Sequence, residues 1–330
     1  MEPDPDPNKT PTPPAEGVRL LWPEIPARVR AAVEGWLGSS VIEAISQPTG
    51  FTPGMAVRLM AANGRRVFVK AIGPEPNSSV PEIYRTEATK VAALKAVPSV
   101  PDLLWSYDEG DGGWVALAFQ DIEGRNPAQP WRMDEFERVV EALIGLSDDL
   151  TPSPLSPEGA GAAPDMFATD LRGWQHLREQ QTSDPRVLDS WSARNLAELA
   201  RLEATSVEVV GGDTLLHFDI RADNILLSPE RVWFVDWPGT CVGAPWVDIV
   251  FFAPSVAMQG GPLPEEVIAL HPACRAADAD AVTAVIAALA GYFTYSSLQP
   301  APPGLPTVRA FQAAQGRVAR EWLARRTGWV

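Results

Sequence analysis

The sequence predicts an α+β protein with two lobes. A small N-terminal lobe would hold a five-stranded antiparallel sheet and one helix, and a larger C-terminal lobe would be mainly helical. Two observations lead to this prediction. Within the first 120 residues, short apolar segments alternate with turns rich in Gly, Pro and Asn, which is typical of antiparallel strands. Beyond residue 130, longer segments with helical periodicity dominate, and 330 residues suffice for two sizeable lobes.

The N-terminal lobe is expected to span residues 18–120. It follows an acidic, proline-rich tail over residues 1–17 that is predicted to be disordered. One amphipathic helix is expected over residues 25–37 and another over residues 79–96. The first three strands have the pattern of an antiparallel meander. The five strands are expected at residues 41–46, 55–61, 66–72, 102–107 and 114–119.

The C-terminal lobe, residues 121–330, is expected to begin with a linker that ends near residue 130. A Pro-, Gly- and Ala-rich stretch over residues 151–164 predicts an exposed loop. The uncharged stretch from Ala281 to Val308 is interrupted by prolines, and its apolar part is too short to span a bilayer, so it predicts a core helix. Helices are expected at residues 134–150, 188–203, 246–257, 279–298 and 308–325.

Charge and composition limit the classes of partner. The formal net charge is −15, of which about −12 falls after residue 120, and such acidity argues against binding to nucleic acid. It would suit a cationic small substrate, and solubility explains it equally well. Cys241 and Cys274 are the only cysteines and have no metal-binding spacing. We therefore expect two reduced thiols in a cytoplasmic protein that does not span a membrane.

The most informative segment runs from residue 215 to residue 248. His217, Asp219 and Asn224 form the pattern H-x-D-x-x-x-x-N, and a hydrophobic strand then leads to Asp236. Kinases use this order of residues for phosphoryl transfer. Asp219 is the candidate base that accepts or orients the proton of a substrate hydroxyl. Asn224 and Asp236 carry the hard oxygen ligands that Mg²⁺ prefers.

Lys70 lies in the apolar strand VFVKAIG, where a buried ammonium needs a counter-charge. The following helix supplies a candidate, because Glu87 lies on its apolar stripe with Ile83 and Val91 one turn away on either side. A lone Lys in a strand is more often an edge residue, and a lone Glu on a helix is usually solvated. Together, ahead of the H-x-D-x-x-x-x-N pattern, Lys70 and Glu87 predict the ion pair that positions the α- and β-phosphates of a nucleotide.

Two further segments are candidates for nucleotide contact. Gly50 and Gly54 lie in the turn between the first two strands, where they would let backbone amides approach phosphate oxygens. An ordinary hairpin turn explains these glycines nearly as well. The apolar strand WVALAF is followed by Gln120, and the kinase order would present backbone groups of Gln120 and Ile122 to adenine.

Three residues of the motif region are candidates for supporting roles. His217 is expected to brace the loop through hydrogen bonds, because its neighbours offer no nucleophile for it to activate. Arg221 could reach the transferring phosphate and stabilise its charge, with a structural role equally open. Asp248 lies near a helix start, where a carboxylate can accept from backbone amides, and we expect it to support the catalytic loop.

The sequence resembles the aminoglycoside phosphotransferase and choline kinase-like family. The resemblance rests on HFDIRADNILL and VWFVDWPGTCVGAPWVD, with Lys70 and Glu87 upstream, and covers residues 40–257. It implies a protein-kinase-like fold, ATP as donor, Mg²⁺ at Asn224 and Asp236, Asp219 as catalytic base, and a small-molecule hydroxyl as acceptor. Only eleven residues separate Asp236 from the next motif carboxylate, which leaves no room for the activation segment of a protein kinase.

The resemblance leaves the acceptor open, and with it any role in antibiotic resistance, because family members phosphorylate aminoglycosides, choline, sugars and amino alcohols. Residues 147–213 hold twelve Asp or Glu against five Arg, which would attract a cationic acceptor or form a solvated face. Two alternatives to an active kinase remain. A catalytically weak pseudokinase would bind nucleotide without turnover. An interaction protein would use its acidic surface and would not depend on Asp219.

Overall fold

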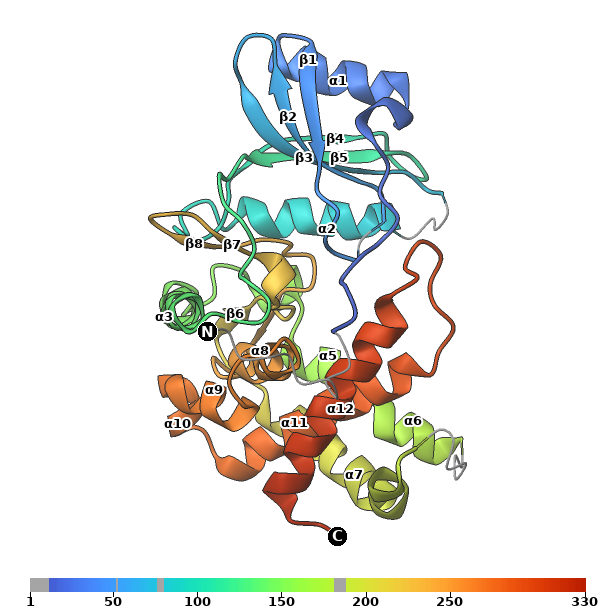
Figure 1. Ribbon diagram of the computed structural model, residues 1–330, viewed down its shortest axis with the longest axis vertical. Helices are drawn as coiled ribbons and strands as arrows, with labels where there is room; N and C mark the ends of the chain where they lie inside the picture. Colours follow the sequence, from blue (N-terminus) through green and yellow to red (C-terminus); the bar gives the residue numbers. More distant parts are fainter. Residues whose placement is uncertain (1–11, 52, 76–79, 181–187) are drawn as a thin grey trace, which may run out of the picture.

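The computed structural model of the protein describes residues 12–51, 53–75, 80–180 and 188–330. Two lobes are stacked along the long axis, with the sheet in the upper lobe and most helices in the lower one (Figure 1). The predicted two-lobed α+β fold is therefore confirmed. The lobe limits and the tail boundary stay predictions, and the first eleven residues of the tail lie outside the described residues.

A five-stranded antiparallel sheet forms the N-terminal lobe, in the order β1-β2-β3-β5-β4. The first three strands form the predicted meander, and β5 then pairs with β3 so that β4 lies at the edge. Each strand begins and ends within one residue of its predicted limits. The strands are β1 (Val41–Ser46), β2 (Met55–Ala61), β3 (Arg66–Ile72), β4 (Leu103–Asp108) and β5 (Val115–Gln120).

Alternation of side chains along the strands gives this sheet two different faces. Helix α1 (Ala27–Leu37) covers one face, where it packs on Val67, Val69 and Ala71 of β3. Helix α2 (Val80–Ala92) covers the other face, where Ile72 and Leu117 belong to the core that continues into the C-terminal lobe. Lys70 lies two residues before Ile72. Its side chain is therefore directed toward α2.

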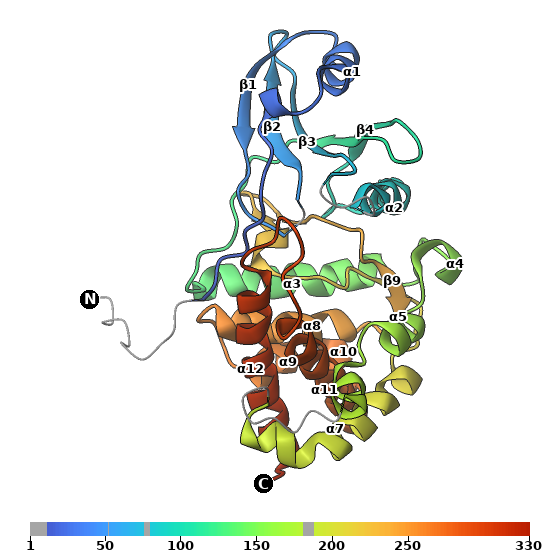
Figure 2. The same ribbon diagram turned by 90° about the vertical axis from the view of Figure 1, so that its right-hand side faces the viewer.

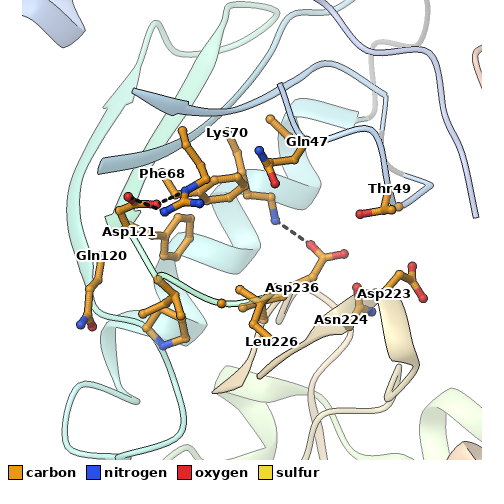
Figure 3. Close-up of a pocket in the computed structure, with 18 of the residues that line it drawn as sticks. Gln47, Thr49, Phe68, Lys70, Gln120, Asp121, Asp223, Asn224, Leu226 and Asp236 are labelled. Carbon is orange, nitrogen blue, oxygen red and sulfur yellow. Dashed lines mark hydrogen bonds and ion pairs between the residues drawn. The ribbon is translucent and has the colours of Figure 1, made fainter. Parts of the chain in front are cut away.

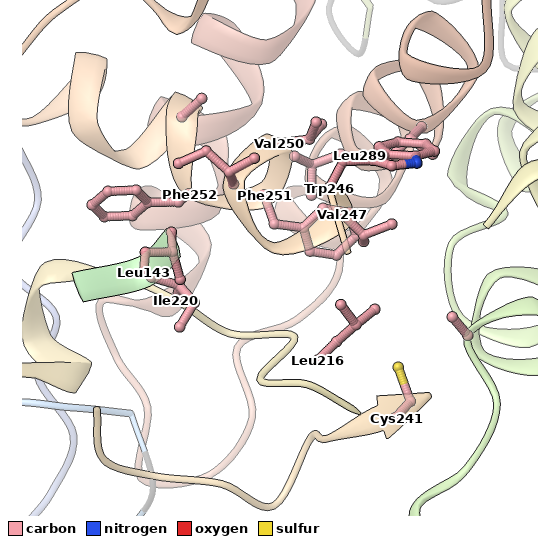
Figure 4. Packing of buried hydrophobic residues seen from close by; sticks show 14 of the residues in the cluster. Leu143, Leu216, Ile220, Cys241, Trp246, Val247, Val250, Phe251, Phe252 and Leu289 are labelled. Carbon is pink, nitrogen blue, oxygen red and sulfur yellow. The ribbon is translucent and has the colours of Figure 1, made fainter. Parts of the chain in front are cut away.

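Five long helices occupy the predicted positions in the C-terminal lobe. They enclose a core to which Leu216, Phe252 and Leu289 contribute from different elements (Figure 4). One of them ends later than predicted, because its amphipathic face continues to residue 209. The helices are α3 (Met133–Asp149), α7 (Ser190–Val209), α8 (Val247–Met258), α11 (Ala279–Ser297) and α12 (Val308–Thr327).

Helix α11 has the length and composition of a membrane-crossing helix, and no other helix among the described residues does. In this fold, 61% of its apolar window is buried inside the protein. It packs against α12, α7 and the short α6 (Gly173–Glu179), as Figure 2 also shows for α12 and α7. The prediction of a core helix in this stretch is confirmed.

Short elements escaped prediction. The stretch 151–164 is not an uninterrupted loop, because α4 (Pro157–Ala160) lies within it and α5 (Ala163–Thr169) begins there. Elements this short have too few residues for a recognisable period, and tertiary contacts stabilise them instead. The others are η1 (Trp22–Glu24), η2 (Ala222–Asn224), α9 (Pro264–Leu270), α10 (Pro272–Ala276), the pair β6 (Thr214–Leu216) and β9 (Cys241–Gly243), and β7 (Ile225–Leu227). Strand β7 pairs with β8 (Val232–Phe234), which is the hydrophobic strand predicted to lead to Asp236.

Candidate active site

A cavity with about 1050 Å³ of empty space, including its open mouth, lies between the lobes (Figure 3). Strands β2, β3 and β5 and the turn before β2 form its N-terminal wall. Helix η2, strand β7 and the segment after β8 form its C-terminal wall. The lining contains most of the residues predicted to hold nucleotide and metal, namely Gly50, Lys70, Glu87, Gln120, Ile122, Asn224 and Asp236.

The Lys70 ammonium lies between two carboxylates. Its Nζ atom donates to Glu87 Oε1 at 2.9 Å, to Glu87 Oε2 at 2.8 Å and to Asp236 Oδ1 at 2.6 Å. Burial alone would lower the pKa of Lys70, but the charges of Asp236 and Glu87 outweigh burial and raise it above its usual value. Lys70 is therefore a fixed cation. Its predicted ion pair with Glu87, which is 1% exposed, is present.

Asp236 follows β8 and has a left-handed backbone conformation, with a φ of 72°. Burial acts to raise the pKa of this carboxyl, but the adjacent Lys70 ammonium holds it below its usual range. The side chain keeps 27% of its surface exposed. Asp236 is thus an ionised carboxylate that a cation entering the cavity can reach.

Asn224 provides the second oxygen expected to bind a metal. Its Nδ2 atom donates to the Asp219 backbone carbonyl at 2.9 Å and to Asp219 Oδ2 at 3.2 Å, which leaves its amide oxygen for a cation. No group of three or more His, Cys, Asp or Glu side chains in the described ranges could hold a metal ion alone. One carboxylate and one amide oxygen fit Mg²⁺ that completes its shell with water and phosphate oxygens.

His217 is fully buried and braces the catalytic loop. The Asp219 N–H donates to His217 Nδ1 at 3.3 Å, so Nε2 carries the ring proton and donates to the Val235 carbonyl at 3.0 Å. Burial lowers the pKa of His217 to about 4, which keeps the ring neutral at physiological pH. These hydrogen bonds agree with the bracing role expected from the sequence.

Asp248 holds the start of the same loop from α8. Its carboxylate accepts from the His217 N–H at 2.7 Å and from the Phe218 N–H at 2.8 Å. Burial raises the pKa of Asp248 to about 6, although the two hydrogen bonds act against that rise. The expected support of the loop by Asp248 is therefore present, and the amides it binds belong to the loop and not to its own helix.

Asp219 and Arg221 form one charged cluster with Asp223. Arg221 Nη1 donates to Asp219, while its Nε and Nη2 atoms donate to the two Asp223 oxygens at 3.0 and 2.9 Å. Burial at the cavity edge raises the pKa of Asp219 to about 7, against the lowering effect of Arg221. The Asp219 side chain nevertheless keeps 44% of its surface exposed, so an acceptor can reach it.

The predicted glycines have different surroundings. Gly50 lines the cavity, but its N–H donates to the Ala15 carbonyl at 2.8 Å, so it does not point at the cavity. Gly54 is not among the described residues that line the cavity. Its φ is 111°, and an added Cβ would lie 2.5 Å from Ile72 and 2.7 Å from the Ala71 carbonyl. Glycine is therefore required at position 54, because β3 lies too close to leave room for a side chain.

The segment after β5 forms the far end of the cavity. The Gln120 N–H donates to the Asp102 carbonyl at 2.9 Å, and Ile122 accepts at its carbonyl from Gly124. Across the described ranges, the Ile122 N–H has no hydrogen-bond partner within the protein. This N–H is therefore available to donate to a nucleotide base.

Sequence reasoning missed several residues that shape this site. Asn126 Nδ2 donates to the carbonyls of Ala222, Asp223 and Ile225, at 3.1, 3.1 and 2.9 Å, and so holds η2 from the linker. No local pattern marks this residue. By contrast, Arg58 is the one charged residue within the apolar strand β2, and Asp121 follows the apolar strand β5. Their paired hydrogen bonds at 2.6 and 3.0 Å could therefore have been suspected.

The fold and the site define a class: a two-lobed kinase-like protein with its reacting groups in the cleft between the lobes. Solved structures of this fold include a choline/ethanolamine kinase family protein from Mesorhizobium loti, with a TM-score of 0.58 and 15% identity over 90% of this chain and 92% of that one. The choline kinase of Streptococcus pneumoniae gives a TM-score of 0.56 and 13% identity over 90% and 98%. A spectinomycin phosphotransferase in complex with ADP and its antibiotic gives 0.52 and 15% over 89% and 97%.

The family follows from the sequence profile of the phosphotransferase enzyme family, which matches residues 56–301. The chain belongs to this family, and it is an ATP-dependent phosphotransferase. No curated protein sequence gives a significant match. The family suspected from the motif is therefore confirmed.

Proposed function

We propose that the protein transfers the γ-phosphoryl group of ATP to a hydroxyl of a small molecule. The observation that carries this proposal is the convergence of Lys70, Asn224 and Asp236 on one cavity, with Asp219 hydrogen-bonded to Asn224 at its edge. Phosphoryl transfer needs a cation for the phosphates, oxygen ligands for Mg²⁺ and a base near the acceptor. These groups meet here although they are far apart in the sequence.

Each residue then has one task. Lys70, fixed by Glu87, binds the α- and β-phosphates, and the Ile122 N–H donates to adenine. Asn224 and Asp236 hold Mg²⁺, which neutralises charge on the phosphate oxygens when bound. The acceptor oxygen forms a bond to the γ-phosphorus as the bond to the bridging oxygen of ADP breaks. Asp219 accepts the proton that the acceptor hydroxyl loses.

Arg221 fits a positioning role better than contact with the transferring phosphate. Its guanidinium already binds both Asp219 and Asp223. Its guanidinium carbon also lies 5.5 Å from the centre of the Phe51 ring and 5.8 Å from the centre of the Phe311 ring, and these two rings pack edge to face. Arg221 therefore orients the base and lowers the pKa of Asp219 relative to what burial alone would impose.

The acceptor need not be a polycation, because part of the acidic charge of residues 147–213 is already bound within the protein. Asp189 pairs with Arg320 at 2.9 Å, and Glu198 pairs with Arg201 at 2.8 Å. Glu203 is buried and accepts from two backbone amides. We therefore propose a small alcohol and place no requirement on its charge.

Acceptor-dependent release of ADP tests the proposal. Amino alcohols, sugars, aminoglycosides and other antibiotics are supplied with MgATP, and Asp219→Asn is compared with Asp111→Asn, an exposed residue of the β4–β5 turn. We expect one class to stimulate release. Asp219→Asn should lower it by about 10²- to 10⁴-fold, and Asp111→Asn should leave it unchanged. Wild-type rates in Asp219→Asn would refute the mechanism, and ATP binding without any turnover would indicate a pseudokinase.

A further inference from the structure

A segment before α1 bridges the two lobes at the mouth of the cavity. We call residues 15–20 the N-terminal strap. In Figure 1 this dark blue chain descends from α1, passes the turn before β2, and reaches the C-terminal lobe beside α12. The Val18 N–H donates to the Gly304 carbonyl at 2.8 Å, and Thr307 Oγ1 donates to the Glu16 carbonyl at 2.9 Å. The strap is therefore anchored to the α11–α12 connection.

The strap is also anchored to the turn that covers the phosphate end of the cavity. The Gly50 N–H donates to the Ala15 carbonyl at 2.8 Å, and the Leu20 N–H donates to the Gly54 carbonyl at 3.0 Å. The residues on both sides of Arg19 are thus fixed by backbone hydrogen bonds, one to each lobe. The backbone from which the Arg19 side chain extends is held in place before any ligand binds.

The Arg19 side chain enters the cavity. It is part of the lining, and its Nη2 atom donates to the Thr49 carbonyl. The same atom lies 2.8 Å from the position that a Cβ on Gly50 would occupy, and the φ of 97° at Gly50 is one that favours glycine. Burial raises the pKa of Tyr84 to about 12, and the charges of Lys70 and Arg19 both act against that rise. Arg19 therefore lies toward the Lys70 end of the cavity.

The described lining of the cavity carries more carboxylates than cations, so a triphosphate would gain from a cation that contacts it directly. Arg58 is bound to Asp121 by two hydrogen bonds, and Lys70 lies between two carboxylates. Among the described residues of the lining, the carboxylates outnumber the cations, with Glu87, Asp121, Asp223 and Asp236 against Arg19, Arg58 and Lys70. A guanidinium is well suited to phosphate, because its planar donors match the oxygen geometry.

We propose that Arg19 is a phosphate-binding residue, supplied to the nucleotide site by the N-terminal strap. The proposal rests on the proposed function, since it assumes that a nucleoside triphosphate occupies the cavity. Arg19 would bind the β- and γ-phosphates from the side opposite Asp236. The turn at Gly50 would then be a platform that holds Arg19 through the Thr49 carbonyl and is itself bound to the strap through the Gly50 N–H.

Nucleotide affinities of the full chain test this assignment by calorimetric titration with MgATP and with adenosine, which lacks phosphates. Arg19→Gln should weaken MgATP binding by about tenfold and leave adenosine binding within about twofold, because a charge-assisted hydrogen bond is lost. Arg19→Lys should recover part of the loss. The control is Arg28→Gln, an exposed residue of α1 paired with Glu109, which should change neither affinity.

The outcomes separate this inference from the function on which it rests. Unchanged MgATP affinity in Arg19→Gln, or an equal loss for adenosine and MgATP, would overturn the role of Arg19 while leaving the kinase proposal intact. A loss in Arg19→Lys as large as in Arg19→Gln would also overturn it. A wild-type chain that binds neither ligand would refute the proposed function and this inference together.

Discussion

Asp219 should titrate near neutral pH, and the rate of phosphoryl transfer should follow its ionisation. Burial raises the pKa of Asp219 to about 7, and the carboxylates of Asp223 and Asp236 add to the rise, while Arg221 opposes it. A base works in its ionised form. Activity should therefore be present above this pKa and should be lost as the pH falls through it.

The size of the effect follows from the pKa. A carboxyl with a pKa of about 7 is about half ionised at pH 7 and about one-tenth ionised at pH 6, so kcat should fall about tenfold for each further unit of acidification. An ordinary aspartate would give a flat profile down to about pH 5. The assay is ADP release at saturating MgATP and acceptor between pH 5.5 and 9.

Arg221→Gln tests the direction in which the neighbouring charge shifts the pKa of Asp219. It removes the cation that lowers the pKa of Asp219, so the acid limb of the kcat profile should move to higher pH. Neither His217, with a pKa of about 4, nor Asp248, with a pKa of about 6, accounts for a limb near pH 7. A profile that stays flat to pH 5.5, or a limb that Arg221→Gln moves to lower pH, would refute the reasoning.

Three other substitutions give expected outcomes. Glu87→Gln leaves Lys70 with Asp236 alone, so MgATP affinity should fall at least tenfold in calorimetry; an unchanged affinity would contradict the role of the pair. Asp236→Asn should abolish Mg²⁺-dependent turnover while adenosine still binds, and full activity would remove Asp236 from the metal site. In Asp248→Asn the side chain can accept a hydrogen bond from only one of the two buried N–H groups that Asp248 binds. The free energy of unfolding, measured by urea titration, should therefore fall by about 1–3 kcal/mol. An unchanged free energy of unfolding would contradict this role of the carboxylate.

Local patterns were sufficient to predict the N-terminal lobe and its ion pair. Alternation in β3 places Lys70 on the face that α2 covers, and helical spacing places Glu87 on the apolar stripe of α2. Each rule acts within a few residues of the chain. Their consequence, the Lys70–Glu87 pair, could therefore be predicted before the fold was known.

Contacts between distant segments could not be predicted in this way. Asn126 holds η2 across about 100 residues of chain, and the strap reaches a carbonyl at Gly304 from the opposite terminus. Such contacts depend on where the lobes meet, which no periodicity encodes. The same reason explains why the local sequence could not decide between phosphate contact and an ordinary hairpin turn for Gly50, whose N–H donates to the Ala15 carbonyl.

The two non-glycine residues with positive φ among the described residues, Phe218 and Asp236, flank the reacting groups. At Phe218 the φ is 67°, a conformation that glycine adopts without a steric cost. The cost for phenylalanine is offset by its ring, which packs 4.8 Å from Phe251 and 6.0 Å from Phe167. Its N–H is also bound by Asp248. Aromatic packing and the Asp248 hydrogen bond thus hold the left-handed backbone of Phe218 directly before Asp219.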